Sequence, residues 1–487
     1  MKKSKEPEYF TSRLALVLAI LGIAIGTGNI WRFPRIIAQN GGGSFIIPWI
    51  IFLFTWSIPL IIIEFSIGKR TRKGTAGAFG KLIGKRYIWM GAFVGFCSMS
   101  IMFYYSVVMG WCLKYLVAVV SGDVRSIINY EYYWNSFIDS RYEPLLFHLL
   151  CMVSAAAITY RGIARGIEKA NYMLIPSLFL IMIFAVVKVL DLPGSKEGLR
   201  FLLIPHLKDL LHYRIWLEAL SQSAWSTGAG WGLILTYAVY VRRKEDIVLN
   251  SFLTGLGDSL ASILAALSII PIVFITLTRE QALKVMASGN TGLTFIWIPQ
   301  LFEKIAGGKI LLPLFFLTLC FAALSSLIAM VELVSRILMD AGIERKKSVL
   351  MVGIMGFLFG IPSAINIGFL NNQDWTWGLG LLVNGIFLTY AVIKFGKSRF
   401  RRELINSEGN NINLGKWFEY VIAFVIPIEF ICVLGWWFWQ SATVFDPQGW
   451  WNPFHTTSIG TCIFQWGIVI AVLLLLNRWM GKRMLSD

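Results

Sequence analysis

The chain has 487 residues, of which 56% are hydrophobic and 15% are charged, with a mean hydropathy of +0.66. Because a typical soluble domain has about 25% charged residues, this composition excludes an ordinary soluble protein and indicates one that crosses a membrane many times. The net charge of +17 lies mainly near the chain ends and in alternate links between apolar segments, which is the pattern of the positive-inside rule. The charge therefore indicates topology rather than a nucleic-acid partner, and it predicts that both termini are cytoplasmic.

About twelve apolar runs are long enough to cross the roughly 30 Å of hydrocarbon in a bilayer. In chain order they cover residues 13–37, 43–67, 88–120, 144–160, 167–190, 215–241, 246–277, 308–340, 348–364, 375–395, 416–440 and 459–480. The sequence therefore predicts an all-α, multi-pass protein of the plasma (cytoplasmic) membrane, surrounded by the lipid bilayer. The links at 121–143 and 278–306 mix charge signs and are expected outside the cell.

Two of these runs contain clusters that break a helix. The first holds GIAIGTGNIWRFP at residues 22–34, of which 22–28 are expected to be unwound, and the sixth holds WSTGAGW at 225–231. A lone glycine in a spanning helix is most often a packing site for a neighbouring helix, but these clusters contain polar residues and lie five segments apart. Interrupted segments at corresponding positions of two halves point to an inverted-repeat transporter with its site near the bilayer midplane. Unwinding exposes carbonyls that can bind a cation and half-helix ends whose dipoles attract charge.

Residues 22–34, the run NGGGSF at 40–45 and residues 225–237 resemble the neurotransmitter:sodium symporter family, especially its prokaryotic members similar to the bacterial leucine transporter. The resemblance covers nearly the whole chain. It implies the leucine-transporter fold, in which two inverted five-helix repeats have broken helices 1 and 6. The implied parts are a cytoplasmic N-terminus at 1–12, repeats at 13–190 and 215–395, an extracellular loop at 191–214, and two further helices with a short tail at 396–487.

The family resemblance implies a sodium-coupled symporter that imports a neutral amino acid or a related small amine by alternating access, as a monomer or weak dimer. It implies two sodium ions. The first would be bound by three backbone carbonyls and two hydroxyls, those of Gly22, Ile25, Ala322, Ser325 and Ser326. From the residues alone, the simpler interpretation is that Ser325 and Ser326 are hydrogen-bonded to carbonyls one turn earlier in their own helix. Because a broken helix lies beside them, we prefer the interpretation that they bind sodium, a hard cation that oxygen ligands suit.

The second sodium would be bound by the substrate carboxylate and by Ala24, Asn29, Ser226 and Asp258. Asp258 stands where the family usually has asparagine, and a carboxylate at this depth marks a functional site. Chloride-dependent members bind an anion nearby, and the candidate chloride ligands here are Gln222, Ser226 and Ser262. We expect the Asp258 carboxylate to replace chloride, because two anions beside one sodium would repel each other. The alternative is a protonated Asp258 in a structural hydrogen bond.

The resemblance places the substrate between the two breaks and segments 3 and 8. The implied lining is Ala24, Thr27, Gly28, Ile101, Tyr105, Trp225, Ser226, Gly228, Trp231, Ser326 and Met330. Ile23 replaces a polar residue of the leucine transporter. Gly26 stands where monoamine transporters have aspartate, which argues against a monoamine because its ammonium group needs a counter-charge. A neutral, apolar amino acid of small or medium size is the favoured substrate.

Gates are also implied by the resemblance. Arg32 is the candidate outer-gate arginine, and Asp374 is its candidate partner. On the inner side Asp340 matches a gate aspartate, but its usual arginine partner is missing because Pro7 falls at that position, and Lys5 is the candidate substitute.

Two other classes of protein fit the sequence less well. An ion channel, whether or not gated by an amino acid, needs a filter loop or a ring of carboxylates, and the sequence has neither. An enzyme needs a constellation of His, Cys or carboxylate residues, and the spanning segments offer only the isolated Asp258. A transport-inactive amino-acid sensor or ligand-gated channel of the same fold remains the alternative to a symporter, because some gating residues are altered.

Overall fold

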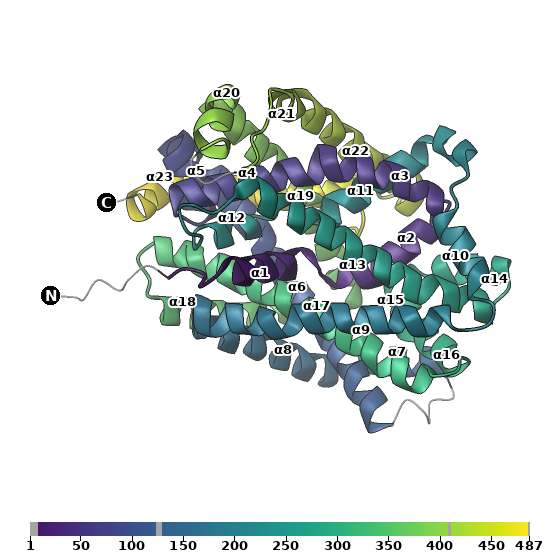
Figure 1. Cartoon of the computed structure of the whole chain (residues 1–487). Coiled ribbons are helices and arrows are strands. Elements are labelled where there is room, and N and C mark those ends of the chain that lie inside the picture. Colours follow the sequence, from purple (N-terminus) through teal and green to yellow (C-terminus); the bar gives the residue numbers. More distant parts are fainter. Residues whose placement is uncertain (1–7, 123–128, 408–410, 486–487) are drawn as a thin grey trace.

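The computed structural model describes residues 8–122, 129–407 and 411–485, and no strand occurs within these ranges. The long helices run roughly parallel to one another, and both termini lie at the same end of the bundle (Figure 1). We call this the terminal end. The short helices α10 (Ser195–Leu203), α14 (Arg279–Met286) and α16 (Ile298–Glu303) lie at the opposite end.

Ten helices of the described ranges are long and apolar enough to cross a membrane. They are Gly43–Thr71 (α3, η2 and α4), Lys85–Ser121 (η3 and α6), Glu143–Tyr160 (α8), Ile163–Leu190 (η5 and α9), Ile247–Thr276 (α13), Gly308–Asp340 (α17), Arg345–Ile365 (α18), Ile367–Phe395 (α19), Trp417–Phe445 (α21, η9, α22 and η10) and Ile459–Met484 (α23). Shorter elements link them: α5 (Thr75–Ile83), α7 (Tyr130–Asp139), η6 (Leu207–Leu211), α15 (Gly289–Thr291), η7 (Gly292–Trp297), α20 (Lys397–Phe400) and η8 (Arg401–Ile405).

The first predicted segment is a bent pair of helices, as its glycines predicted. Helix α1 (Arg13–Ala24) meets η1 (Gly28–Arg32) and α2 (Phe33–Gln39) at 54°. The expected unwinding of residues 22–28 is wrong in extent, because only Ile25 and Gly26 lie outside helical structure. The break stays short because the amide oxygen of Asn29 accepts a hydrogen bond from the Gly26 N–H at 2.9 Å, which supplies the partner that the interrupted helix no longer offers.

The sixth predicted segment is divided into α11 (Tyr213–Ser226) and α12 (Leu233–Ala238). The residues between them include Gly228, Gly230 and Gly232, all with φ between +71° and +87°, a region that L side chains rarely adopt. The ten long helices and the bent first pair give up to eleven spans in the described residues, and the divided sixth segment is not among them because its two helices are short.

A buried carboxylate holds the second break in place. Glu64 of α4 (Ile58–Thr71) is fully buried and accepts hydrogen bonds from Gly230 N at 2.7 Å and Leu235 N at 3.1 Å. The first amides of a helix have no partner within the helix, and a negative charge beside them is favoured by the helix dipole. Glu64 therefore satisfies backbone groups of the break and of the start of α12.

Glu64→Gln should destabilise the fold, because an amide cannot accept hydrogen bonds with both side-chain atoms. We expect a loss of about 1–3 kcal/mol, as for a buried hydrogen-bonding group left unsatisfied. The measurement is the apparent melting temperature of the purified protein in detergent. The control is Glu280→Gln, which removes the charge from an exposed pair with Lys284 and should change stability by less than about 1 kcal/mol. Equal melting temperatures for the two variants would contradict this account of Glu64.

Candidate functional site

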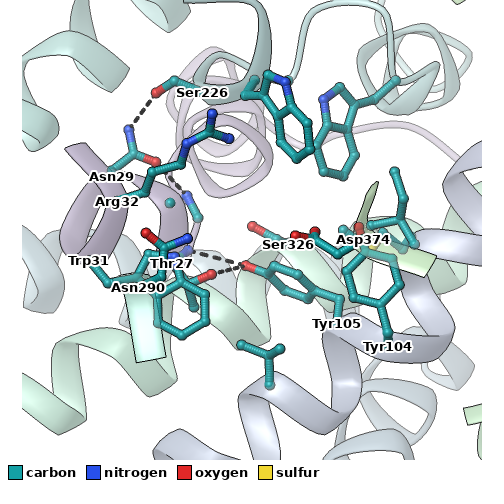
Figure 2. Close-up of a pocket in the computed structure, with 18 of the residues that line it drawn as sticks. Thr27, Asn29, Trp31, Arg32, Tyr104, Tyr105, Ser226, Asn290, Ser326 and Asp374 are labelled. Atoms are coloured by element: carbon teal, nitrogen blue, oxygen red, sulfur yellow. Dashed lines mark hydrogen bonds between the residues drawn. The ribbon is translucent and has the colours of Figure 1, made fainter. Parts of the chain in front are cut away.

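A cavity of about 250 Å³ lies between the two helix breaks, α6 (Ile88–Ser121), α17 and α19 (Figure 2). All eleven residues assigned to the substrate pocket from the sequence line it, together with Ile23, Gly26, Asn29, Arg32, Gln222 and Asp374. The cavity also reaches residues that the sequence did not single out, namely Trp31, Tyr104, Val108, Trp111, Leu233, Asn290, Thr291, Leu370 and Asn371. Asn290 and Thr291 come from the 278–306 link, so the cavity extends from the breaks toward the end opposite the termini.

Helix ends of both signs meet at this cavity. Helices α1 and α11 end beside it at Ala24 and Ser226, and the helical stretch that continues through α2 starts beside it at Thr27. Helix C-termini carry a partial negative charge and N-termini a partial positive charge. The cavity can therefore accommodate a cationic group and an anionic group at neighbouring positions.

A polar cluster, made of Asn29, Ser226, Asp258 and Ser262, borders the cavity. The Asn29 amide nitrogen lies 2.6 Å from Asp258 Oδ1, 2.9 Å from Ser262 Oγ and 3.1 Å from Ser226 Oγ. Ser226 Oγ donates to Asp258 Oδ2 at 3.0 Å. Asp258 and Ser262 are fully buried on α13. Gln222 lies one turn before Ser226 on the same cavity wall, and within the described residues its Oε1 is buried without a hydrogen-bond partner.

The residues assigned to the first sodium come together where α1 packs on α17. Ser326 Oγ lies 3.4 Å from the Gly22 carbonyl of α1 and 3.2 Å from the Ala322 carbonyl of its own helix. Ser325 Oγ donates to the Ala322 carbonyl at 2.9 Å. Both serines thus make the local bonds of the simpler interpretation, and Ser326 also reaches across to α1. Ile25 follows α1 directly and is fully buried.

Tyr105 points into the middle of the cavity from α6 (Figure 2). Its hydroxyl oxygen accepts a hydrogen bond from Thr27 N at 3.2 Å and lies 3.4 Å from Thr27 Oγ1. A Cβ on Gly26 would lie 3.2 Å from that hydroxyl and 3.4 Å from Ser326 Oγ. The lack of a side chain at Gly26 therefore leaves room around the Tyr105 hydroxyl. This hydroxyl can donate a hydrogen bond to a bound anionic group.

Arg32 covers the cavity on the side away from the termini. Its guanidinium lies 4.5 Å from the ring centre of Trp225, a cation–π distance. Arg32 and Asp374 line the same cavity and attract each other electrostatically. Within the described residues they do not form a direct ion pair, and the carboxyl group of Asp374 also interacts with the side chain of Tyr104.

Asp340 is bonded at the terminal end by residues that the sequence analysis did not name. It pairs with Arg336 one turn earlier on α17 at 2.8 Å and accepts a hydrogen bond from Gly74 N at 2.5 Å. Arg336 is therefore an arginine partner on the same helix as Asp340, because residues four apart lie on one helix face. Lys5 and Pro7 lie outside the described residues.

A second acidic group closes the terminal end beside Asp340. Glu332 of α17 is fully buried and lies 2.5 Å from both Arg345 Nη2 and the Tyr240 hydroxyl. Arg345 also lies 3.4 Å from Glu8, and Phe10 N donates to the Tyr240 carbonyl at 3.1 Å. These contacts join the chain segment before α1 to the turn after α12, to α17 and to α18.

Sequence reasoning missed Glu64 and Glu332, although each carries a recognisable signal. Glu64 interrupts the apolar run IPLIIIEFSIG, and Glu332 interrupts LIAMVELVS. An acidic residue within a spanning segment is costly and is usually functional. Asp258 was found by this criterion; applied to every segment, the same criterion would have found the other two.

Comparison with known proteins gives consistent matches over most of the chain. The sequence profile of the Sodium:neurotransmitter symporter family matches residues 7–136 and 138–482. An uncharacterized sodium-dependent transporter of Methanocaldococcus jannaschii is 31% identical, covering 96% of this chain and 97% of the relative. A second one, from Bacillus subtilis, is 29% identical over 88% of this chain and 97% of the relative. The crystal structure of MhsT in complex with L-phenylalanine superposes with a TM-score of 0.77 at 29% identity, covering 88% of this chain and 99% of MhsT.

Gly378→Ala should push Trp225 off Arg32. A Cβ on Gly378 of α19 would lie only 1.9 Å from Cη2 of Trp225, and overpacking of this kind costs about 1–3 kcal/mol. Adding Trp225→Phe, which shortens the ring, should restore most of the lost stability. Melting temperatures of the two single variants and the double variant measure the coupling. Additive effects in the double variant would show that the two residues do not compete for this space.

Proposed function

Because the chain belongs to the sodium:neurotransmitter symporter family, and is thus a sodium-dependent transporter rather than an enzyme, we propose that it imports a neutral amino acid together with sodium. One observation carries this finer assignment: the cavity between the two helix breaks shares Asn29 and Ser226 with the polar cluster at Asp258. A solute in the cavity and a cation in the cluster would touch the same side chains. The free energies of binding the two would therefore be coupled, and the coupling acts equally in both directions.

The two ends of an amino acid match the two kinds of helix end at the cavity. The carboxylate would lie near the start of the helix at Thr27, where the partial positive charge favours an anion. It would accept a hydrogen bond from the Tyr105 hydroxyl. The ammonium group would lie near the carbonyls that end α1 and α11. Ile23, Ile101 and Met330 on the cavity wall favour an apolar side chain. The complex of MhsT with L-phenylalanine agrees with a substrate of this class.

Sodium binding at Asp258 supplies a physical route for coupling. The ion would replace the Asn29 amide hydrogens as the partner of the carboxylate, and the Asn29 oxygen would turn toward the ion. That oxygen now holds the Gly26 N–H, so its departure would free this N–H to bind the substrate carboxylate. Ala24 and Ser226 would complete the ligands of this sodium. The first sodium would lie between α1 and α17, at the Gly22, Ile25 and Ala322 carbonyls and the hydroxyls of Ser325 and Ser326.

Asp258 is proposed to provide the negative charge that chloride provides in other members. The carboxylate lies within hydrogen-bonding distance of Asn29 and Ser226, and Ser262 is bonded to the same Asn29 amide. A chloride ion held by Gln222, Ser226 and Ser262 would be placed close to this carboxylate. Two negative charges at that separation in a site of low dielectric repel strongly, so chloride is not needed while Asp258 is ionised.

Alternating access is proposed to work through the contacts at the two ends. The terminal end, which we assign to the cytoplasm from its basic links, is closed by the pairs of Arg345 with Glu332 and of Arg336 with Asp340. The opposite end is covered by Arg32 on Trp225, and Asp374 would pair with Arg32 when the cavity closes. Opening the cytoplasmic side requires the first of these sets to break while the second forms.

Uptake into proteoliposomes tests the symporter assignment. The twenty amino acids are first screened for stabilisation of the purified protein in sodium against potassium, and the best is then offered as a radiolabelled solute. We expect uptake above the equilibrium level only with an inward sodium gradient. An electrical current that dissipates gradients without accumulation would instead identify a channel, and binding without flux would identify a sensor. Either result would overturn the proposal.

Asp258→Asn tests the charge-substitution hypothesis. With the carboxylate gone, the site lacks one negative charge, so we expect sodium-driven uptake to fall at least tenfold without chloride and to recover when chloride is added. Gluconate replaces chloride as the control anion, and the wild-type protein should take up substrate equally in both salts. Unchanged uptake by Asp258→Asn in gluconate would show that Asp258 does not take the place of chloride.

A further inference from the structure

An asparagine on α9 (Lys169–Leu190) has a buried oxygen that its surroundings do not satisfy. Asn171 is 1% exposed, and its amide nitrogen donates to the Ile167 carbonyl of the preceding turn at 2.9 Å. Among the residues that the structure describes, no donor reaches its Oδ1. A buried polar atom without a partner costs about 1–3 kcal/mol, so this oxygen is available to a ligand that reaches it.

Asn171 lies on the face of α9 that contacts the first helix. Glu168, one turn before it, accepts the Thr11 N–H at 3.0 Å. Tyr172, the next residue, has its hydroxyl 2.9 Å from Ser12 Oγ. Residues spaced three and four apart share one side of a helix. Glu168 at the end of η5 and Asn171 and Tyr172 at the start of α9 therefore form a polar strip along the interface with the first helix.

The unsatisfied oxygen points at the proposed first sodium site. A Cβ on Gly22 would lie 2.2 Å from Asn171 Oδ1 and 3.1 Å from Ser325 Cβ, so the amide oxygen and Ser325 reach the same side of Gly22. The carbonyl of Gly22 lies 3.4 Å from Ser326 Oγ. Helices α1, α9 and α17 pack on one another in all three pairings. Gly22 thus lacks a side chain where oxygens from two other helices converge on α1.

We propose that Asn171 supplies its amide oxygen as a further ligand of the sodium between α1 and α17, an inference that rests on the function proposed above. An oxygen ligand suits a hard cation, and a bound cation would satisfy the atom that the protein leaves unpaired. The rest of the amide is already oriented for this role, because its nitrogen is held by Ile167 on the far side.

With a ligand from α9, the ion would be coordinated by three helices. With carbonyls and hydroxyls from α1 and α17 alone, the ion joins two helices. With Asn171 as a ligand, the ion would also connect α1 to the polar strip. This connection would lie next to the contacts of Thr11 with Glu168 and of Ser12 with Tyr172. Sodium would then favour the arrangement in which α1 is docked at the terminal end, and loss of the ion would release α1 from both neighbours at once.

Sodium titration of thermal stability tests this proposal on the full-length protein in detergent, with potassium replacing sodium at constant ionic strength. Asn171→Leu removes the oxygen at similar volume and should raise the sodium concentration for half-maximal stabilisation about tenfold, the equivalent of one interaction with a charged group. Asn171→Asp keeps an oxygen and should bind sodium at least as tightly as the wild type. Asn384→Leu, at an equally buried asparagine on α19, is the matched control and should leave the sodium midpoint unchanged.

A purely structural role for Asn171 gives a different result. Both Asn171 variants would then lower the melting temperature in potassium and leave the sodium midpoint where the wild type has it, which would overturn the ligand assignment. Failure of sodium to stabilise the wild-type protein at all would instead contradict the proposed sodium-coupled function. The two failures are therefore distinguishable in one set of titrations.

Discussion

Backbone polar groups cannot remain unpaired in hydrocarbon, and the two helix breaks are where this chain meets that constraint. At the first break, Asn29 accepts the Gly26 N–H and confines the irregular backbone to two residues. At the second, Glu64 accepts the N–H groups of Gly230 and Leu235. The breaks are stable in the membrane because the side chains of Asn29 and Glu64 replace the missing helix partners.

The same constraint orders the buried charges. Four buried acids have different partners. Glu64 is bonded to backbone amides, and Asp258 to an asparagine and a serine. Glu332 is bonded to an arginine and a tyrosine, and Asp340 to an arginine and a backbone amide. Of these four acids, only Asp258 is bonded to neutral side chains alone, which a cation can displace. This difference explains why one of the four acids is assigned to ion binding, and why the others are assigned to holding the breaks and closing one end.

Much of the site could be predicted, and the exceptions have physical causes. The glycine clusters located both breaks, and the eleven pocket residues that the family resemblance implied line one cavity. The length of the first break was overestimated, since the Asn29 side chain that shortens it acts through a bond that no spacing rule predicts. Arg336 was not predicted as the partner of Asp340, because the family resemblance implies a partner in the N-terminal segment rather than on the same helix face. Asn171 gave no signal in the sequence, because one asparagine in an apolar run is unremarkable until its neighbours are known.

Composition and hydropathy determined that the chain spans a membrane and about where it does so, and the glycine clusters determined which two segments are interrupted, because these properties depend on residues near one another in sequence. Tertiary structure decided which atoms face the breaks. Asn29 and Asp258 are separated by more than two hundred positions, as are Tyr240 and the segment at Phe10. Only packing brings such groups within hydrogen-bonding distance, and the energy of a buried polar group depends on which partner packing supplies. The sequence therefore determined the membrane spans and the positions of the breaks, and the tertiary structure determined which distant residues contact one another to form the site.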